Sequence, residues 1–217
     1  LERVYLRLPN WVGDVVLATP MLHALREAAP KADIALHGRG LCLKLLEGEG
    51  LANTLLPIQK RLGPMWPMLE GQRVRREWGR PDLAILLPNS FSATVVAYAT
   101  GAPRRAGYRI NGRGLLLTDG PSVETQGLLR PIPMVDYYLD LLASLGASVE
   151  GQARRPRLSS SPESRDWAEA FLTRHQLNAP STRIWALNLG GSWLSKRWIP
   201  EYAGQLARRI LKAGIQP

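Results

Sequence analysis

The chain has 217 residues, enough for one large domain or for one and a half smaller ones. Its hydrophobic content of 45% and charged content of 21% are ordinary for a globular protein, and no apolar run reaches the ~18 residues of a membrane span. A net charge of +10 favours anionic partners, but the basic residues are scattered and form no nucleic-acid-binding motif, so no nucleic acid is expected among the partners.

Short apolar runs alternate with amphipathic ones, a pattern typical of a parallel sheet covered by helices on both faces. The predicted strands are Val4–Leu8, Ala32–His37, Thr54–Ile58, Asp82–Leu87, Arg105–Tyr108, Leu115–Thr118 and Ile184–Leu189. The predicted helices are Val15–Ala28, Leu41–Glu47, Met68–Trp78, Ala93–Thr100, Met134–Leu145, Pro162–His175 and Pro200–Ala213. The fold class expected is therefore α/β with a Rossmann-like parallel sheet.

Two proline positions bear on where helices begin. Ser161-Pro162 has the N-cap and first-turn residues of a helix start. Thr19-Pro20 has the same character inside the first helical region, which predicts an irregular beginning for that helix.

The turn Asn10-Trp11-Val12-Gly13-Asp14 directly follows the first predicted strand. Ligands of open α/β sheets bind at the carboxyl ends of the strands, which is where this turn would lie. Asp14 is interpreted either as a helix N-cap or as a general base that needs a hydroxyl within reach. The two roles are compatible.

A second loop, Gly190 to Trp198, combines glycines, a hydroxyl and two cations before a helix. Backbone N–H groups at such a turn can bind a diphosphate, and Lys196 can offset charge on a leaving phosphate. An ordinary solvated surface loop explains the same residues. The order of a Walker P-loop is absent, and Gly38-Arg39-Gly40 lacks the full dinucleotide fingerprint, which argues against a nicotinamide enzyme.

Polar and basic residues later in the first domain also have two interpretations. Asn89 and Ser90 follow the predicted strand Asp82–Leu87 and either bind a polyol or cap the next helix. A group of four arginines either binds carboxylates and phosphates or forms a solvated face; they are Arg104, Arg105, Arg109 and Arg113.

Cysteine and histidine usage predicts neither a disulfide nor a metal site. Cys42 is the single cysteine and is expected to be a small buried side chain in a reducing compartment. The three histidines have no metal-ligand spacing.

The order of elements predicts one complete domain followed by the beginning of another. We expect a first domain over residues 1–150, a connector and linking helix over 151–182, and an incomplete second domain over 183–217. The chain opens at Leu1 without a methionine and enters a strand at once, so we expect no signal peptide and a truncated chain.

With these motifs in hand, the chain resembles the lipopolysaccharide heptosyltransferases, the ADP-heptose-dependent members of glycosyltransferase family nine, and most of all their heptosyltransferase II branch. The resemblance rests on five segments that run in family order; they are Leu8 to Asp14 with Thr19-Pro20, Leu87 to Phe91, Arg104 to Arg109, Gly190 to Ser192, and Lys196 to Pro200.

The resemblance implies a GT-B architecture of two Rossmann-like domains, the first for a lipid-linked acceptor and the second for the nucleotide sugar. It implies that Asp14 is the catalytic base of an inverting transfer that needs no metal or other cofactor. It implies donor-binding roles for Gly190, Gly191, Ser192 and Lys196. It implies acceptor-binding roles for Asn10, Trp11, Gly13, Asn89, Ser90, Arg105 and Arg109.

The substrates implied are ADP-L-glycero-D-manno-heptose and heptosyl-Kdo-lipid A, with the enzyme peripheral to the cytoplasmic face of the inner membrane of a Gram-negative bacterium. Two alternatives stay open. One is a family-nine transferase with a different sugar or acceptor, and the other is a non-catalytic fragment that binds an anionic glycolipid. Because the adenine-binding segments of the family lie beyond residue 217, we expect this chain alone to bind ADP-heptose poorly and to be inactive.

Overall fold

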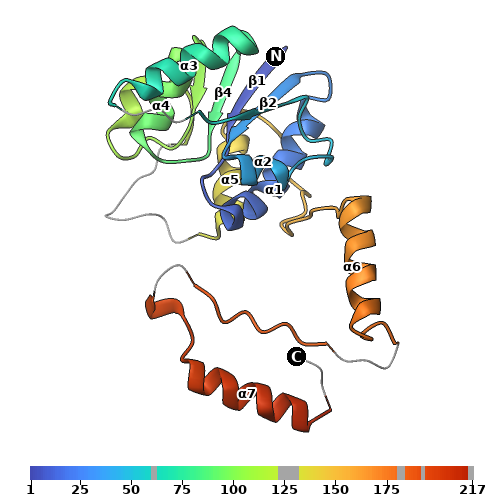
Figure 1. Ribbon diagram of the computed structural model, residues 1–217. Coiled ribbons are helices and arrows are strands. Elements are labelled where there is room, and N and C mark those ends of the chain that lie inside the picture. The colour runs from blue at the N-terminus through green and yellow to red at the C-terminus, as the bar shows by residue number, and fades with distance from the viewer. Residues whose placement is uncertain (60–62, 122–131, 180–183, 192–193, 215–217) are drawn as a thin grey trace. The chain divides into compact units, whose positions relative to one another are not determined.

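The computed structural model describes residues 1–59, 63–121, 132–179, 184–191 and 194–214 (Figure 1). The chain divides into two compact units, Leu1–Ser159 and Ser160–Pro217. Each unit is described here by itself. None of the helices in the described part of the chain combines the length and the apolar character that a bilayer crossing needs.

Unit 1 is built on a five-stranded sheet in which every neighbouring pair is parallel, as the sequence predicts. The strands are β1 (Arg3–Arg7), β2 (Asp33–Gly38), β3 (Thr54–Pro57), β4 (Leu83–Leu86) and β5 (Arg104–Ala106). Their order across the sheet is β3-β2-β1-β4-β5, so β1 is central, with Leu6 between Leu36 of β2 and Ile85 of β4.

Helices cover both faces of this sheet, with α3 and α4 on one face and α1, α2 and α5 on the other (Figure 1). The helical elements of unit 1 are α1 (Val12–Ala28), α2 (Gly40–Lys44), α3 (Trp66–Glu77), α4 (Phe91–Ala99), the 3-10 turn η1 (Arg113–Leu116) and α5 (Met134–Ala143).

The alternation of side chains along each strand divides the core in two. Val4 and Leu6 of β1 pack in the cluster that includes α1 and α5, while Tyr5 packs in the opposite cluster with α3 and α4. In β4, Ile85 and Leu86 divide in the same way. All four residues of β4 are buried, which is why its sequence is almost continuously apolar.

The first helix does not begin irregularly, so the expectation from Thr19-Pro20 is wrong. Helix α1 runs unbroken from Val12 to Ala28 with Pro20 inside it. Proline has no N–H for the carbonyl four residues earlier, that of Val16. The hydroxyl of Thr19 donates to this carbonyl at 2.8 Å, so the helix continues past the proline.

The predicted strand Leu115–Thr118 is also wrong, because this segment begins in η1. Arg113, at the start of η1, is completely buried, and its guanidinium donates to the carbonyl oxygens of Tyr108 and Pro88. These bonds hold the chain in a tight turn where a strand would run straight on.

Residues 151–159 return across unit 1. The amide of Gln152 donates to Glu27 at 2.6 Å, and the backbone N–H of Arg157 donates to the Thr19 hydroxyl at 3.2 Å. The backbone N–H of Ser159 donates to Glu49 at 2.6 Å. The segment thereby belongs to the first compact unit.

Unit 2 contains α6 (Pro162–Arg174), the 3-10 turn η2 (Leu194–Lys196) and α7 (Pro200–Lys212). Ser161 caps α6 by accepting from the N–H of Ser164, as Ser161-Pro162 predicts. The predicted strand Ile184–Leu189 is wrong, since this segment is irregular apart from a bridge at Ile184. A strand is stable only when a neighbouring strand hydrogen-bonds with its backbone. The described part of unit 2 contains no strand with which residues 184–189 could pair.

Candidate functional site

The carboxyl edge of the sheet has a topological switch point between β1 and β4. From β1 the chain goes outward through β2 to β3, then returns to place β4 on the other side of β1. The loops after β1 and β4 therefore diverge to opposite faces, and crevices at such points are the usual ligand sites of open α/β sheets. Asn10 follows β1 and Asn89 follows β4, so both lie at this edge.

Asp14 lies in the first turn of α1. The N-cap position belongs to Trp11, whose backbone is extended and whose side chain makes no capping bond, so the interpretation of Asp14 as N-cap is wrong. The partial positive charge at a helix start favours a carboxylate there. Asp14 is half-buried, and within the described residues it has no hydrogen-bond or ion-pair partner.

The phenol of Tyr138 in α5 is close enough to sense the charge of Asp14. Burial raises the pKa of Tyr138 well above its ordinary value, and the negative charge of Asp14 raises it further. The Asp14 carboxylate in the first turn of α1 is therefore near the phenol of Tyr138.

A cavity of about 360 Å³ opens at the same edge of the sheet. Its walls come from the loops after β1, β2, β3 and β4, and include Arg7, Asn10, Arg39, Trp66, Ser90 and Ser92. A larger hollow of about 530 Å³ runs along α3, where it is lined by residues such as Leu69 and Arg76, and none of the predicted site residues lies there.

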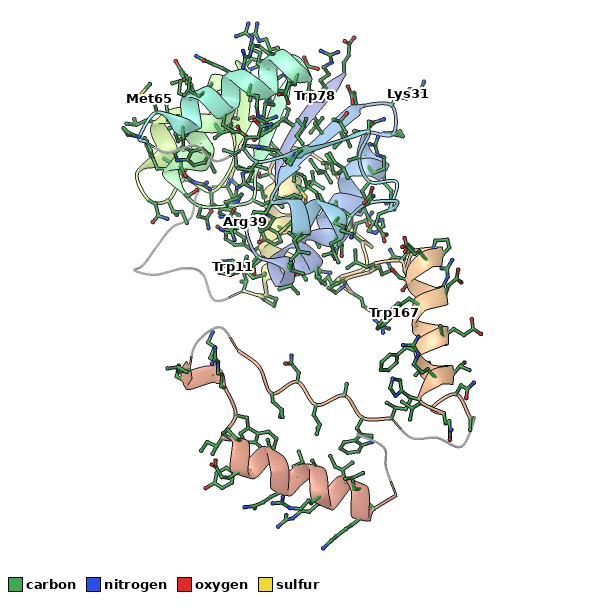
Figure 2. The ribbon with its side chains drawn as sticks, viewed as in Figure 1. Trp11, Lys31, Arg39, Met65, Trp78 and Trp167 are labelled. Carbon is green, nitrogen blue, oxygen red and sulfur yellow. The ribbon has the colours of Figure 1, made fainter. Side chains whose placement is uncertain are left out.

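Two contacts fix the Asn10–Asp14 turn beside this cavity. Arg7 donates to the side-chain oxygen of Asn10 at 2.7 Å. The guanidinium of Arg39 lies over the exposed ring of Trp11, 5.6 Å from its centroid, and Figure 2 labels the two side chains at the same end of unit 1. Cys42 is buried beneath the turn, with Sγ 3.8 Å from the Asn10 carbonyl, which confirms its expected packing role.

Asn89 and Ser90 have clear structural partners. The Ser90 hydroxyl accepts from the N–H of Ala93 and caps α4, as one of its two interpretations predicted. The Asn89 amide donates to the Tyr137 hydroxyl at 2.8 Å and accepts from Arg113 at 2.8 Å. Both ends of the Asn89 side chain are thereby held in one orientation.

The four arginines of the 104–113 cluster all bind groups of the protein itself. Arg104 pairs with Asp119 at 2.7 Å. Arg105 donates to the Leu116 carbonyl at 2.6 Å and lies over the ring of Tyr98, and Arg109 donates to the Thr118 carbonyl at 2.9 Å. Arg113 is buried while Arg104 and Arg109 are exposed, so the cluster stabilises the segment from β5 to η1 and also presents charge to solvent.

In unit 2, the described part of the glycine loop folds back on itself. A Cβ atom on Gly191 would lie 3.1 Å from the Lys196 carbonyl oxygen, so the close approach favours glycine. Arg197 donates to the Gly191 carbonyl at 2.8 Å. Lys196 ends η2 with an exposed side chain, and Gly190 precedes the turn. Ser192 lies outside the described residues.

Sequence reasoning missed a buried polar network that joins β1, β2 and α3. The Tyr5 hydroxyl lies 2.6 Å from His37 Nδ1, and His37 Nε2 lies 2.9 Å from Glu70, which Arg73 also binds at 2.7 Å. Burial raises the pKa of Glu70, but bonds from His37, Arg73 and the backbone of Gln59 outweigh it and lower the pKa to about 2.

The low pKa of Glu70 indicates which groups of the network carry protons. An ionised Glu70 can only accept, so His37 Nε2 carries the proton that it donates, and His37 Nδ1 accepts from the Tyr5 hydroxyl. Burial lowers the pKa of His37, consistent with a neutral ring. No sequence signal marks this network, because Tyr5, His37 and the Glu70–Arg73 pair are distant from one another in the chain, and Glu and Arg are rarely fully buried.

Comparison with known proteins identifies the family of this chain. The family model for glycosyltransferase family 9 (heptosyltransferase) matches residues 72–216. Lipopolysaccharide heptosyltransferase 2 of Escherichia coli is 26% identical over 96% of this chain and 60% of its own length. The enzyme of the same name from Salmonella typhimurium is 28% identical over 64% of this chain and 39% of its own length.

Solved structures show the same fold. The family 9 glycosyltransferase from Veillonella parvula superposes with a TM-score of 0.83 at 22% identity, covering 99% of this chain and 60% of that one. E. coli ADP-heptose lipopolysaccharide heptosyltransferase II superposes with a TM-score of 0.72 at 22% identity, covering 99% of this chain and 62% of that one. The chain thus spans about 60% of the length of the E. coli relative that it matches.

Proposed function

The chain belongs to glycosyltransferase family 9, and from this we propose that it serves the transfer of heptose from ADP-L-glycero-D-manno-heptose to heptosyl-Kdo-lipid A of the lipopolysaccharide inner core. The observation that carries the proposal is the Asp14 carboxylate at the switch point of the sheet, which has no hydrogen-bond or ion-pair partner among the described residues. The names of the relatives support the substrates, since both are lipopolysaccharide heptosyltransferases.

In the proposed reaction, Asp14 removes the proton from an acceptor hydroxyl. The hydroxyl oxygen attacks the anomeric carbon of the donor from the face opposite ADP, the bond from that carbon to the diphosphate oxygen breaks, and the configuration inverts. A carboxylate in this position can act as a general base because, within the described residues, no cation pairs with it. The proton ends on Asp14 and the electron pair on ADP.

We assign the donor diphosphate to the loop of unit 2. Lys196 would offset the charge that builds on the leaving diphosphate, as a fixed cation does in other transfers of this type. Gly190, Gly191 and Ser192 would bring backbone N–H groups and a hydroxyl to the phosphates. The exposed Lys196 ammonium and the close turn at Gly191 support this assignment.

We assign the acceptor to unit 1. Its sugar hydroxyls would meet the residues at the carboxyl edge, among which Asn89 is held in one orientation by Tyr137 and Arg113. The full proposed set is Asn10, Trp11, Gly13, Asn89, Ser90, Arg105 and Arg109. Because the acceptor is lipid-linked, we also propose that the enzyme works in contact with the cytoplasmic face of the inner membrane.

The proposal is tested with the complete gene product that contains this chain. Asp14→Asn removes the base but keeps the size of the side chain, so transfer from ADP-heptose to truncated lipopolysaccharide should fall by about 10²- to 10⁴-fold. Binding of ADP should persist. Asp166→Asn, at an exposed aspartate of α6, is the matched control and should transfer normally.

Product analysis distinguishes this function from other activities of family 9. A heptosylated inner core supports the proposal, whereas transfer of another sugar would assign a different family 9 activity. Normal turnover by Asp14→Asn would refute the role of Asp14.

A further inference from the structure

Arg7 is a buried cation that forms no ion pair within the described part of the chain. Only 6% of the residue is exposed, yet its guanidinium lines the 360 Å³ cavity at the carboxyl edge of the sheet. It donates to the carbonyl oxygens of Leu8 and His37 and to the side-chain oxygen of Asn10, all of which are neutral acceptors. Burying a charge is costly unless an opposite charge pairs with it.

A second guanidinium lines the same cavity. Arg39 follows β2, its side chain is exposed, and it forms no ion pair within the described residues. Burial lowers the pKa of Arg7, and the positive charge of Arg39 lowers it further, so the two cations are near enough to repel each other. No carboxylate is found among the described residues that line this cavity.

Glu70, the carboxylate whose charge acts on Arg7, is already engaged. Glu70 raises the pKa of Arg7 slightly, but its carboxylate binds Arg73 at 2.7 Å and His37 at 2.9 Å. It therefore cannot turn to pair with Arg7. Among the residues that the structure describes, no carboxylate is left to pair with the positive charge in the cavity.

Hydrogen-bond donors complete the walls. The hydroxyls of Ser90 and Ser92 lie at the beginning of α4, whose N-terminus carries partial positive charge toward the cavity edge. A phosphate or carboxylate suits paired guanidinium groups, because its oxygens accept several N–H bonds at once. A neutral sugar has no comparable match to two cations.

We propose that this cavity binds one anionic group of the acceptor, a sugar carboxylate or a sugar phosphate, between Arg7 and Arg39. The inference rests on the proposed function only in naming the acceptor as the source. The Arg7–Asn10 bond links the cavity to the turn that carries Asp14. An anion bound at Arg7 would therefore place the rest of the acceptor relative to that carboxylate.

The test is an NMR titration of the chain, followed through its indole N–H signals, because Trp66 lines the cavity and Trp11 contacts Arg39. The probes are glucose 6-phosphate, glucuronate and neutral glucose. We expect saturable shifts with one or both charged sugars and none with glucose. The two charged probes separate a phosphate from a carboxylate as the natural group.

Substitutions locate the site. Arg39→Gln should weaken binding of the charged sugar about tenfold, the effect of losing one charge-assisted bond. Arg7→Lys, which keeps the charge but not the planar fork, should also weaken it. Arg155→Gln, at an exposed arginine away from the cavity, should bind as the wild type does. If Arg7→Lys does not fold, the titration of Arg39→Gln still tests the site, because Arg39 is exposed.

Absence of saturable shifts with both charged sugars would overturn the inference, and so would binding that Arg39→Gln leaves unchanged. The titration contains no donor and measures no turnover, so its result is independent of the transfer assay. Transfer without anion binding would refute the cavity assignment alone, whereas anion binding without transfer would refute the proposed function alone.

Discussion

Gly71 of α3 meets the backbone of Val96 in α4 so closely that a Cβ atom on Gly71 would lie 2.2 Å from the Val96 carbonyl oxygen. The same Cβ would lie 2.5 Å from the side chain of Ala99. The two helices that cover one face of the sheet therefore pack in direct backbone contact, which the absence of a side chain at residue 71 permits.

Gly71→Ala should force α3 and α4 apart. We expect the free energy of unfolding to fall by about 1–3 kcal/mol, the usual cost of overpacking a close contact. Urea denaturation followed by circular dichroism measures the change. Gly40→Ala is the control, because a Cβ there would meet nothing within 4 Å. Equal stability of Gly71→Ala and the wild type would show that the helix contact is looser than described.

The buried carboxylate of Glu70 should make the fold sensitive to acid. Its pKa is about 2 in the folded chain and 4.5 ordinarily, so the unfolded chain takes up the proton first as the pH falls. Stability from Glu70 is complete above pH 4.5 and is lost toward pH 2. Between pH 5 and pH 3 we expect it to contribute a loss of about 2 kcal/mol.

His37 acts in the same direction at higher pH. The pKa of the His37 ring is lowered in the folded chain. As the pH falls below the ordinary value of 6.5, the ring is therefore protonated in the unfolded chain while it stays neutral in the folded chain. Urea midpoints measured from pH 7 to pH 3 test both groups. Glu70→Gln should be less stable at pH 7 and lose less stability below pH 5, whereas Glu47→Gln, at an exposed glutamate, should follow the wild type. A Glu70→Gln curve parallel to that of the wild type would contradict the assignment.

Arg113 holds three segments together, and its loss should destabilise unit 1. Its guanidinium donates to Tyr108 O, Pro88 O and the Asn89 side chain, while burial lowers its pKa to about 10. Arg113→Met would leave the Pro88 carbonyl and the Asn89 side-chain oxygen without this donor, while the Tyr108 carbonyl keeps its bond from the N–H of Ile110, and we expect a loss of about 3 kcal/mol. Arg113→Lys should recover only part of it, because an ammonium lacks the planar fork.

Thermal denaturation measures these effects. Arg109→Lys is the matched control, because Arg109 is exposed and donates to a single backbone carbonyl, that of Thr118. Full recovery by Arg113→Lys would show that the charge, and not the hydrogen-bond geometry, is what the site needs.

The sheet could be predicted from the sequence because the apolar residues of each strand reflect how far the strand is buried. The run Asp82–Leu87 is apolar at nearly every position, and β4, which this run forms in the structure, is buried on both faces. Ends of elements were harder to predict. Helix α1 begins at Val12 although Trp11 supplies no capping bond, so the first turn had no sequence signal.

The site was predictable in position but not in its electrostatics. Gly13 and Asp14 lie in the first turn of α1, directly after β1, and the topology of the sheet puts them at the expected edge. The buried guanidiniums of Arg7 and Arg113 could not be foreseen, since long charged side chains are almost always exposed. Only the folded chain brings their carbonyl acceptors together, and this is also why Leu115–Thr118 turns instead of extending.

The returning segment 151–159 has a practical consequence for anyone who divides this protein. A fragment that stops at residue 150 would lack the hydrogen-bond partners of Glu27, Thr19 and Glu49. It would also expose the buried Thr19 hydroxyl in the middle of α1 to solvent. An autonomous version of the sheet domain should therefore be expressed through Ser159. Its last nine residues form neither helix nor strand, but they hydrogen-bond to the first helix and so stabilise it.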